Sequence, residues 1–136
     1  MESITIFCDG GSRGNPGPAA SAFVAEQSDK VVEKESRFLG VTTNNVAEYT
    51  AVNMALEWLF KNQKKYATAK IILDSELVTK QISGEYKIKS QKLAPLAVSA
   101  KKLLNNISTQ VLFEWSPRSG NYKSDSLVNE ELDKNT

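Results

Sequence analysis

The stretch SITIFCDGGSRGNPGP, residues 3–18, decides how the fold begins. Its first seven residues alternate, with Ile4, Ile6 and Cys8 on one side and Asp9 on the other, which is the period-two pattern of a β-strand. Glycine, asparagine and proline dominate residues 10–18, so this segment is predicted to be a turn that ends the strand at Asp9. An acidic side chain is therefore expected at the carboxyl end of the first strand.

The next two segments, residues 19–27 and 31–39, are predicted to be strands joined by the polar turn at residues 28–30. Short connections favour antiparallel pairing, so the first third of the chain is predicted to form a three-stranded meander.

An amphipathic helix is predicted over residues 43–61, where apolar residues recur at helical spacing. Thr42, Thr43 and Asn44 are all suitable N-caps, and the pattern does not choose among them. The apolar strand at residues 70–74 follows this helix, and such a crossover connection makes the strand parallel to an earlier one.

The remaining elements are predicted from shorter signals. Ser75 is expected to cap a short helix through residue 82, and a helix at residues 93–104 is expected to be interrupted early by Pro95. Residues 110–115 are predicted to be a fifth strand and residues 125–132 a terminal amphipathic helix. The predicted fold class is α/β, with a mixed five-stranded sheet, three antiparallel strands followed by two parallel ones, and helices on both faces.

Length and composition indicate a single ordinary globular domain. The 136 residues are 40% hydrophobic, carry a net charge of +1, and contain no apolar run of the roughly 18 residues that cross a membrane. We expect one domain over residues 1–136, with a core at about 3–133 and a short tail at 134–136. The first residues, Met-Glu-Ser-Ile, lack the pattern of a signal peptide, and the single cysteine excludes an internal disulfide, so a cytoplasmic protein is expected.

Four widely spaced acids are the candidate catalytic residues, since each lies where a predicted strand ends or a helix passes: Asp9, Glu48, Asp74 and Asp125. The chain has no histidine, its single cysteine lies in an apolar strand, and no serine has a nucleophile context. Carboxylates without nitrogen or sulfur ligands favour Mg²⁺ or Mn²⁺, and phosphoryl transfer is the commonest chemistry of such sites. If the strands that carry Asp9 and Asp74 are parallel neighbours, their ends lie roughly 5 Å apart.

Each acid also has a simpler explanation. Asp9 precedes two glycines and suits a turn, and Asp74 with Ser75 suits a helix cap. Asp125 suits the start of a helix, and Glu48 suits an exposed helix position. These explanations are weaker jointly than singly, because they require all four acids to meet at one sheet edge by coincidence.

Residues 80–102 hold six lysines and one glutamate, Glu85, and therefore form a basic segment. A solvated face and a surface that follows nucleic-acid phosphates both explain such a segment, and charge alone does not separate them.

The strings that carry the acids resemble, in order, the motifs of the type 1 ribonuclease H family, in particular a subgroup that lacks histidine. The strings are DGGSRGNPGPA at 9–19, TNNVAEY at 43–49, ILDSELV at 72–78, WSPRSGN at 115–121 and DSLVNEELD at 125–133. The resemblance covers nearly the whole chain and implies a ribonuclease H fold. It also implies endonucleolytic hydrolysis of the RNA strand of RNA–DNA hybrids, giving 5′-phosphate and 3′-hydroxyl ends.

By this resemblance, the four acids bind two Mg²⁺ ions, with Mn²⁺ as a substitute. A monomer is expected, and the lack of a long apolar run predicts no membrane contact. The residues it implies for substrate binding are Gly10, Gly11, Ser12, Asn15, Thr43, Asn44, Asn45, Arg118 and Asn121, to which the basic segment adds Lys87 and Lys89. Two alternatives stay open: a relaxed nuclease that also cuts double-stranded RNA, since both duplexes display 2′-hydroxyls, and a non-catalytic hybrid-binding module.

The chain departs from the family pattern at three places. Many members of the family carry a histidine in the loop before the last helix. This chain has none there, so the role of that histidine is vacant or passes to Arg118. Ser124 and Ser126 replace small apolar residues beside Asp125, which makes this acid the weakest match of the four. Residues 90–105 are too short for the basic protrusion of some bacterial members, so weak and salt-sensitive hybrid binding is expected.

Overall fold

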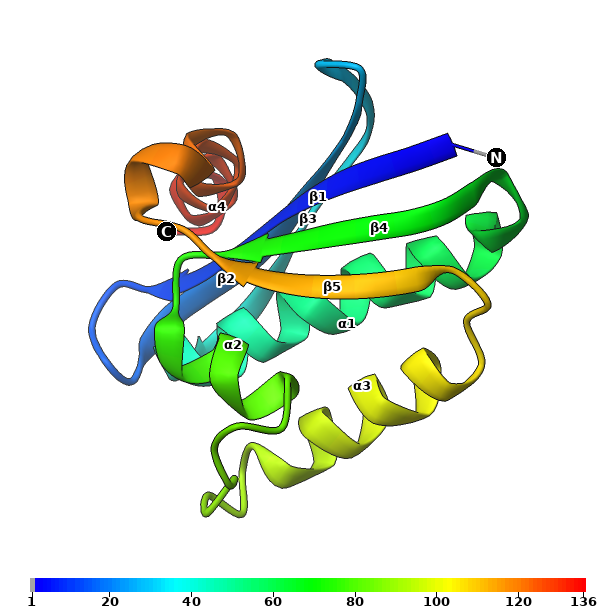
Figure 1. Cartoon of the computed structure of the whole chain (residues 1–136). Helices are drawn as coiled ribbons and strands as arrows, with labels where there is room; N and C mark the ends of the chain where they lie inside the picture. Colours follow the sequence, from blue (N-terminus) through cyan, green and yellow to red (C-terminus); the bar gives the residue numbers. More distant parts are fainter. Residues whose placement is uncertain (1) are drawn as a thin grey trace.

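The computed structural model describes residues 2–136, which form one five-stranded sheet with helices on both faces (Figure 1). The strands are β1 (Glu2–Ser12), β2 (Gly17–Gln27), β3 (Lys30–Thr42), β4 (Tyr66–Leu73) and β5 (Gln110–Trp115). The helices are α1 (Asn44–Asn62), α2 (Glu76–Ile82), α3 (Ala94–Asn105) and α4 (Tyr122–Asn135), with short 3₁₀ turns η1 (Gln63–Lys65) and η2 (Arg118–Asn121).

The sheet has the strand order β3-β2-β1-β4-β5. β1 pairs antiparallel with β2, and β2 pairs antiparallel with β3, while β4 runs parallel to both β1 and β5. The β2–β3 turn lies at Ser28 and Asp29, which both have positive φ, the conformation that a tight hairpin requires. The predicted meander and the predicted parallel crossover are therefore both confirmed.

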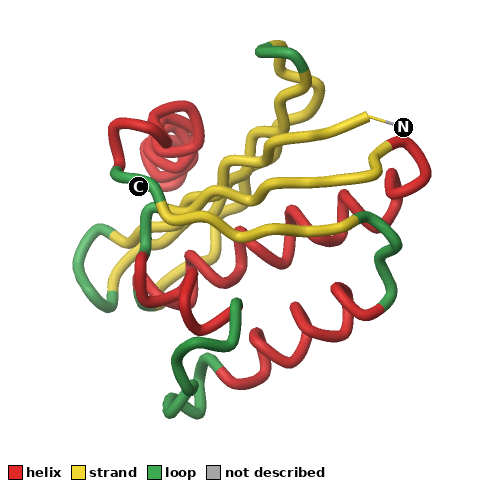
Figure 2. The backbone as a smooth tube through the Cα atoms, viewed as in Figure 1, coloured by secondary structure: helices red, strands yellow, loops and turns green. Residues whose placement is uncertain are grey.

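Two groups of helices cover the two faces of the sheet. α1 lies across one face and buries its small and aliphatic residues against β1 and β2, and α2 and α3 pack beside it on the same face (Figures 1 and 2). α4 packs alone on the other face, over β1, β2 and β3, where Val128 and Leu132 contact the alanines of β2. The core lies between α1 and the sheet, and the carboxyl ends of β1 and β4 border an open cleft.

Several elements differ from the prediction. β4 begins at Tyr66 rather than at residue 70, and β3 extends to Thr42 rather than to residue 39. β1 does not end at Asp9 but continues to Ser12, because residues 10–12 form a regular ladder with β2. Pro95 does not interrupt α3, since it occupies the first turn, where its missing N–H has no helical partner to lose. α4 begins at Tyr122, so Asp125 lies within the first turn of that helix. None of the helices in residues 2–136 has the length and apolar character needed to span a bilayer.

Candidate active site

Asp9 and Asp74 lie side by side because the strands that carry them are parallel neighbours. Cys8 of β1 stands opposite Leu73 of β4 in the ladder, and the two acids follow these residues directly. Asp9 is only 5% exposed, and the Asp74 side chain is 8% exposed. The sheet thus brings two carboxylates to one edge, as the sequence predicted, and buries both.

Glu48 reaches the same edge because α1 passes very close to β1. A side chain at Gly10 would overlap the backbone of Ala47 and Glu48, so only glycine permits this approach. The hydroxyl of Ser21, on β2, donates to the carbonyl of Ala47 and fixes the helix at this point. The helix begins just before, where Thr43 accepts a hydrogen bond from the Val46 amide as the N-cap.

Asp125 comes to the site from the opposite face of the sheet, on α4. Asn121, the residue directly before α4, is 1% exposed, and its Nδ2 donates to the carbonyl of Cys8 at 2.7 Å. Ser124 donates in turn to Oδ1 of Asn121 at 2.8 Å. This buried Asn–Ser pair connects the residue before Asp9 with the residue before Asp125, and so holds the two carboxylates near each other.

The convergence of four acids makes ionisation of the site costly. Burial, and then the negative charges of the three other acids, raise the pKa of Asp9 from 3.8 to about 8. Burial raises the pKa of Glu48 from 4.5 to about 7, although the hydroxyl of Ser75 opposes part of the shift. Burial also raises the pKa of Asp74, against the attraction of Arg118. A positive charge in the site would therefore strongly stabilise the ionised carboxylates.

The protein's own groups supply this positive charge only in part. Arg118 pairs with one of the acids, with its Nε 3.7 Å from Oδ2 of Asp74, but its side chain is 78% exposed. Oε2 of Glu48 and Oδ2 of Asp74 are both buried and accept no hydrogen bond. Buried oxygens without donors are expected where an external cation completes the site, and an all-oxygen donor set fits a hard divalent ion.

The four acids line a polar cleft of about 560 Å³ together with most of the predicted substrate-binding residues. Gly10, Gly11, Ser12, Asn44, Asn45 and Arg118 also lie on its walls. Ser12 donates from its amide and its hydroxyl to Oδ1 of Asn44, at 2.7 and 3.0 Å, and the Asn44 amide donates to Oδ1 of Asn15 at 3.1 Å. These bonds join the end of β1 to the start of α1 along one wall of the cleft.

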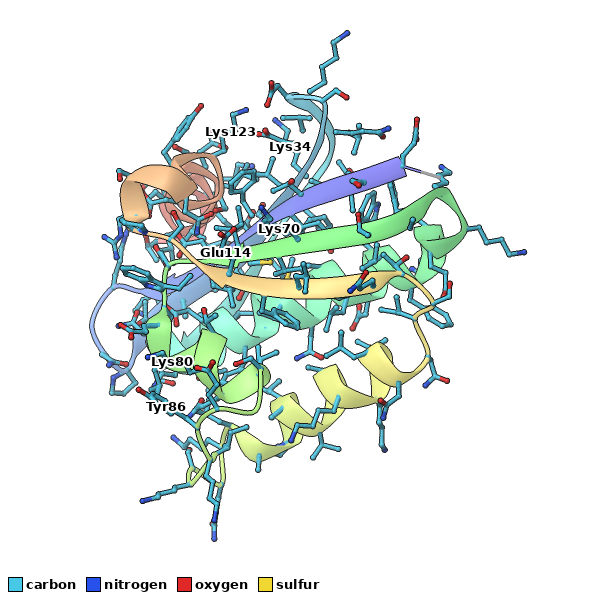
Figure 3. All side chains as sticks on the ribbon, in the orientation of Figure 1. Lys34, Lys70, Lys80, Tyr86, Glu114 and Lys123 are labelled. Atoms are coloured by element: carbon cyan, nitrogen blue, oxygen red, sulfur yellow. The ribbon has the colours of Figure 1, made fainter. Side chains whose placement is uncertain are left out.

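Five of the predicted substrate-binding residues do not line the cleft: Asn15, Thr43, Asn121, Lys87 and Lys89. Asn121 is buried and uses its amide inside the protein, which leaves no exposed atom for substrate, so its structural link between β1 and α4 explains it better. Lys87 and Lys89 are exposed on the segment between α2 and α3 and do not line the cleft. That segment is held to α2 where Lys80 contacts Tyr86 at 3.3 Å and also pairs with Glu76 (Figure 3).

Among the cleft residues that were not singled out from the sequence are Ser75 and Arg13. Ser75 was expected only as a cap, which it is, but its hydroxyl also acts on Glu48. Arg13 lines the cleft mouth, and its Nη2 lies 2.6 Å from Oδ1 of Asp133 at the end of α4. Both lie within the matched motifs, and their spacing along the chain gave no sign that they would face the acids.

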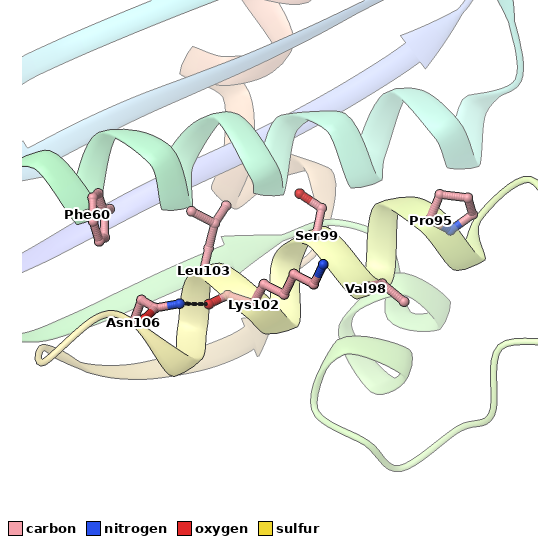
Figure 4. Close-up of a pocket in the computed structure, with 7 residues that line it drawn as sticks. All are labelled: Phe60, Pro95, Val98, Ser99, Lys102, Leu103 and Asn106. Atoms are coloured by element: carbon pink, nitrogen blue, oxygen red, sulfur yellow. Dashed lines mark hydrogen bonds between the residues drawn. The ribbon is translucent and has the colours of Figure 1, made fainter.

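A second hollow of about 440 Å³ lies between α1 and α3 (Figure 4). Its walls are Phe60, Pro95, Val98, Ser99, Lys102, Leu103 and Asn106. It lies toward the far end of α1 and has no carboxylate among these residues, so it lacks the groups that the predicted chemistry needs.

The comparisons with known proteins agree with the geometry. The family model described as RNase H matches residues 1–133. A bifunctional protein of Mycobacterium tuberculosis is 37% identical over 132 residues, which is 96% of this chain and 35% of that protein. Ribonuclease HI of Halobacterium salinarum is 36% identical over 135 residues, covering 96% of this chain and 64% of that protein. The chain therefore spans about a third of the first relative and less than two thirds of the second.

Solved structures match over nearly the full chain. The N-terminal RNase H domain of a Mycobacterium tuberculosis protein has a TM-score of 0.90 at 36% identity, covering 98% of this chain and 96% of that one. LC11-RNase H1, solved in complex with an RNA/DNA hybrid, also has a TM-score of 0.90 at 36% identity, covering 96% of this chain and 97% of that one.

Proposed function

The chain belongs to the RNase H family, and from this premise we propose that it hydrolyses the RNA strand of RNA–DNA hybrids as an endoribonuclease. Cleavage is expected to leave 5′-phosphate and 3′-hydroxyl ends. The observation that carries the proposal is the cleft in which four carboxylates converge, two of them with buried oxygens that accept no hydrogen bond. The hybrid seen with LC11-RNase H1 supports this choice of substrate.

Enzymes of this family generally depend on divalent metal ions, and we propose Mg²⁺, with Mn²⁺ as a substitute. Asp9, Glu48, Asp74 and Asp125 would hold two ions, which when bound stabilise the attacking and leaving oxygens of an in-line displacement. In residues 2–136 no three acidic, histidine or cysteine side chains already have a geometry that could hold a metal ion. Side-chain rotation into range is therefore part of the proposed binding.

The chain's other cleft residues are proposed to select and orient the substrate. A Cβ at Gly11 would lie 3.8 Å from Cγ1 of Val128, and its absence lets a nucleic-acid backbone approach the main chain there. Asn45 lines the cleft, and Nδ2 of Asn44 has no hydrogen bond to the described residues, so both amides can meet 2′-hydroxyls in the wide minor groove. Thr43 stands at the N-terminus of α1, a favourable place for a phosphate of the DNA strand.

Arg118 is proposed to assist at the site of the missing loop histidine. Its exposed guanidinium already faces Asp74, so it can reach the scissile phosphate without crossing the protein. Lys87 and Lys89 are proposed to add weaker, salt-sensitive contacts outside the cleft.

Labelled RNA–DNA hybrid, RNA duplex and DNA duplex, each incubated with Mg²⁺ and the protein, test the proposal. Cleavage of the hybrid alone is the expected result, and Asp9→Asn should abolish it. Asp29→Asn, the same change in an exposed turn, serves as the control. Equal cleavage of RNA duplex would favour the relaxed nuclease, and hybrid binding without cleavage would favour a non-catalytic module.

We also propose that the chain acts as a single domain and a monomer in the cytoplasm. The buried free thiol of Cys8 is compatible with a reducing compartment. Sedimentation of the protein with and without hybrid would test the monomer.

A further inference from the structure

Tyr49 follows Glu48 on α1 and points into the protein. Its side chain is fully buried, and its hydroxyl donates to Oε1 of Gln81 on α2 at 2.6 Å. Gln81 is itself 7% exposed, so this is a short hydrogen bond between two buried polar groups.

The same two elements also carry two of the site's carboxylates. Glu48 precedes Tyr49 on α1, and Asp74 immediately precedes the cap residue of α2, Ser75. Ser75 lines the cleft together with Glu48, and its hydroxyl lowers the pKa of that carboxyl. α1 therefore meets the junction of β4 and α2 at the cleft, where Glu48 and Ser75 lie. It meets α2 again inside the protein, where Tyr49 donates to Gln81.

α2 depends on such contacts for its position. It has seven residues, which is too short for a helix that is stable alone, and an irregular segment follows it to residue 93. Its inward-facing residues are Val78, which is fully buried in the core, Thr79 and Gln81, and Ile82 packs against the core at its end. An apolar contact at Val78 tolerates sliding and rotation of the helix, whereas a hydrogen bond of 2.6 Å fixes both.

We propose that Tyr49 and Gln81 are positioning residues: their hydrogen bond sets the position of α2 on α1, and with it the spacing of the Glu48 and Asp74 carboxylates. This inference rests on the proposed function, because it assigns the pair a role in divalent-ion binding. Neither residue lines the cleft, so neither touches substrate or ion.

Three variants separate positioning from plain stability. Tyr49→Phe and Gln81→Met each leave one buried polar group without its partner, and both should lower the urea midpoint of unfolding in metal-free buffer. The double variant replaces both groups by apolar ones of similar shape, so its midpoint should return toward that of the wild type. Tyr66→Phe is the matched control, since Tyr66 is also buried but lies at the start of β4.

Mg²⁺ binding measured by calorimetry, without substrate, is the decisive readout. Loss of an outer contact that orients a metal ligand weakens metal binding by about 10-fold, and we expect this loss in the double variant despite its recovered stability. Its kcat on labelled hybrid should fall with KM unchanged, because the substrate-binding wall of the cleft is intact. Tyr66→Phe should keep both values.

Two results would overturn the inference. If the double variant has the same Mg²⁺ affinity and kcat as the wild type, the pair contributes stability alone. In that case the proposed function still stands, provided that the wild-type protein cleaves hybrid. A wild-type protein that neither binds Mg²⁺ nor cleaves hybrid would instead remove the proposed function and this inference together.

Discussion

The metal-free protein should lose stability as the pH rises, because its site acids bind protons more tightly in the folded state than in the unfolded chain. The pKa of Asp9 is raised from 3.8 to about 8, and that of Glu48 from 4.5 to about 7. Their protonated forms are compatible with folding, so this contribution to stability is fully present below about pH 4. It is lost progressively as the pH rises through 7 toward 8.

Asp9→Asn removes the largest part of this penalty. A tenfold difference in proton affinity is worth about 1.4 kcal/mol, so full ionisation of a carboxyl with a pKa near 8 costs on the order of 5 kcal/mol. Water in the open cleft reduces both the cost of burying the charge and the repulsion between the acids, so we expect the variant to gain about 3 kcal/mol over the wild type near pH 8. Near pH 5 the gain should be smaller, on the order of 1 kcal/mol, because Asp9 is then neutral in the folded protein and the wild type bears only the cost of taking up a proton from the ionised unfolded chain.

Urea unfolding in EDTA at about pH 5, 6.5 and 8 measures this difference, and the same series with Mg²⁺ should remove most of it for the wild type. Asp29→Asn should follow the wild type at each pH, because Asp29 lies in an exposed turn with a φ of 64° that asparagine also adopts. If wild-type stability in EDTA stays level or rises between pH 5 and 8, or if Asp9→Asn is the less stable protein at pH 8, the acids do not repel one another as argued.

Three other changes have definite expected results. Gly10→Ala forces a methyl group into the backbone of Ala47 and should cost about 3 kcal/mol or more in urea unfolding, and a loss below 1 kcal/mol would show that α1 can move away. Asn121→Ala leaves the carbonyl it contacts on β1 without a donor and should cost about 2–3 kcal/mol, whereas a loss of substrate affinity at unchanged stability would restore its predicted substrate role. Reversing the charges of Lys87 and Lys89 should raise KM and lower the salt dependence of hybrid binding by about one logarithmic slope unit per lysine, and an unchanged KM would make them a solvated surface.

The sequence was sufficient for features that depend on short-range pattern. Alternation identified β1, the apolar stripe identified α1, and the connection between the strands at residues 3–9 and 70–74 predicted their parallel pairing. Once that pairing is known, the meeting of Asp9 and Asp74 follows from geometry alone. The acids could therefore be assigned to one edge without knowledge of any side-chain position.

Features that depend on tertiary contact were not accessible in this way. Residues 10–12 have turn composition, yet they continue β1 because β2 supplies partners for their backbone groups. Asn121 is polar and lies in a matched motif, so it was predicted to face substrate, but the carbonyl of Cys8, far away in sequence, draws it inside. Composition identifies a polar group, whereas only the fold decides whether a protein atom or a ligand satisfies it.

The structure also shows how the fold tolerates a site that opposes it. The repulsive carboxylates stand at one edge of the sheet, and buried polar bonds reach each of their elements from behind: Ser21 to the backbone of Ala47 on α1, Tyr49 to α2, and Asn121 to β1. Each bond joins two elements that carry an acid or lie beside an element that carries one. The elements therefore cannot separate to relieve the repulsion. The raised pKa values persist for this reason, since a looser frame would let the carboxylates move apart into water and return to their ordinary acidity. The same three hydrogen bonds thus keep the elements behind the cleft rigid and keep the carboxylates close enough together to bind cations.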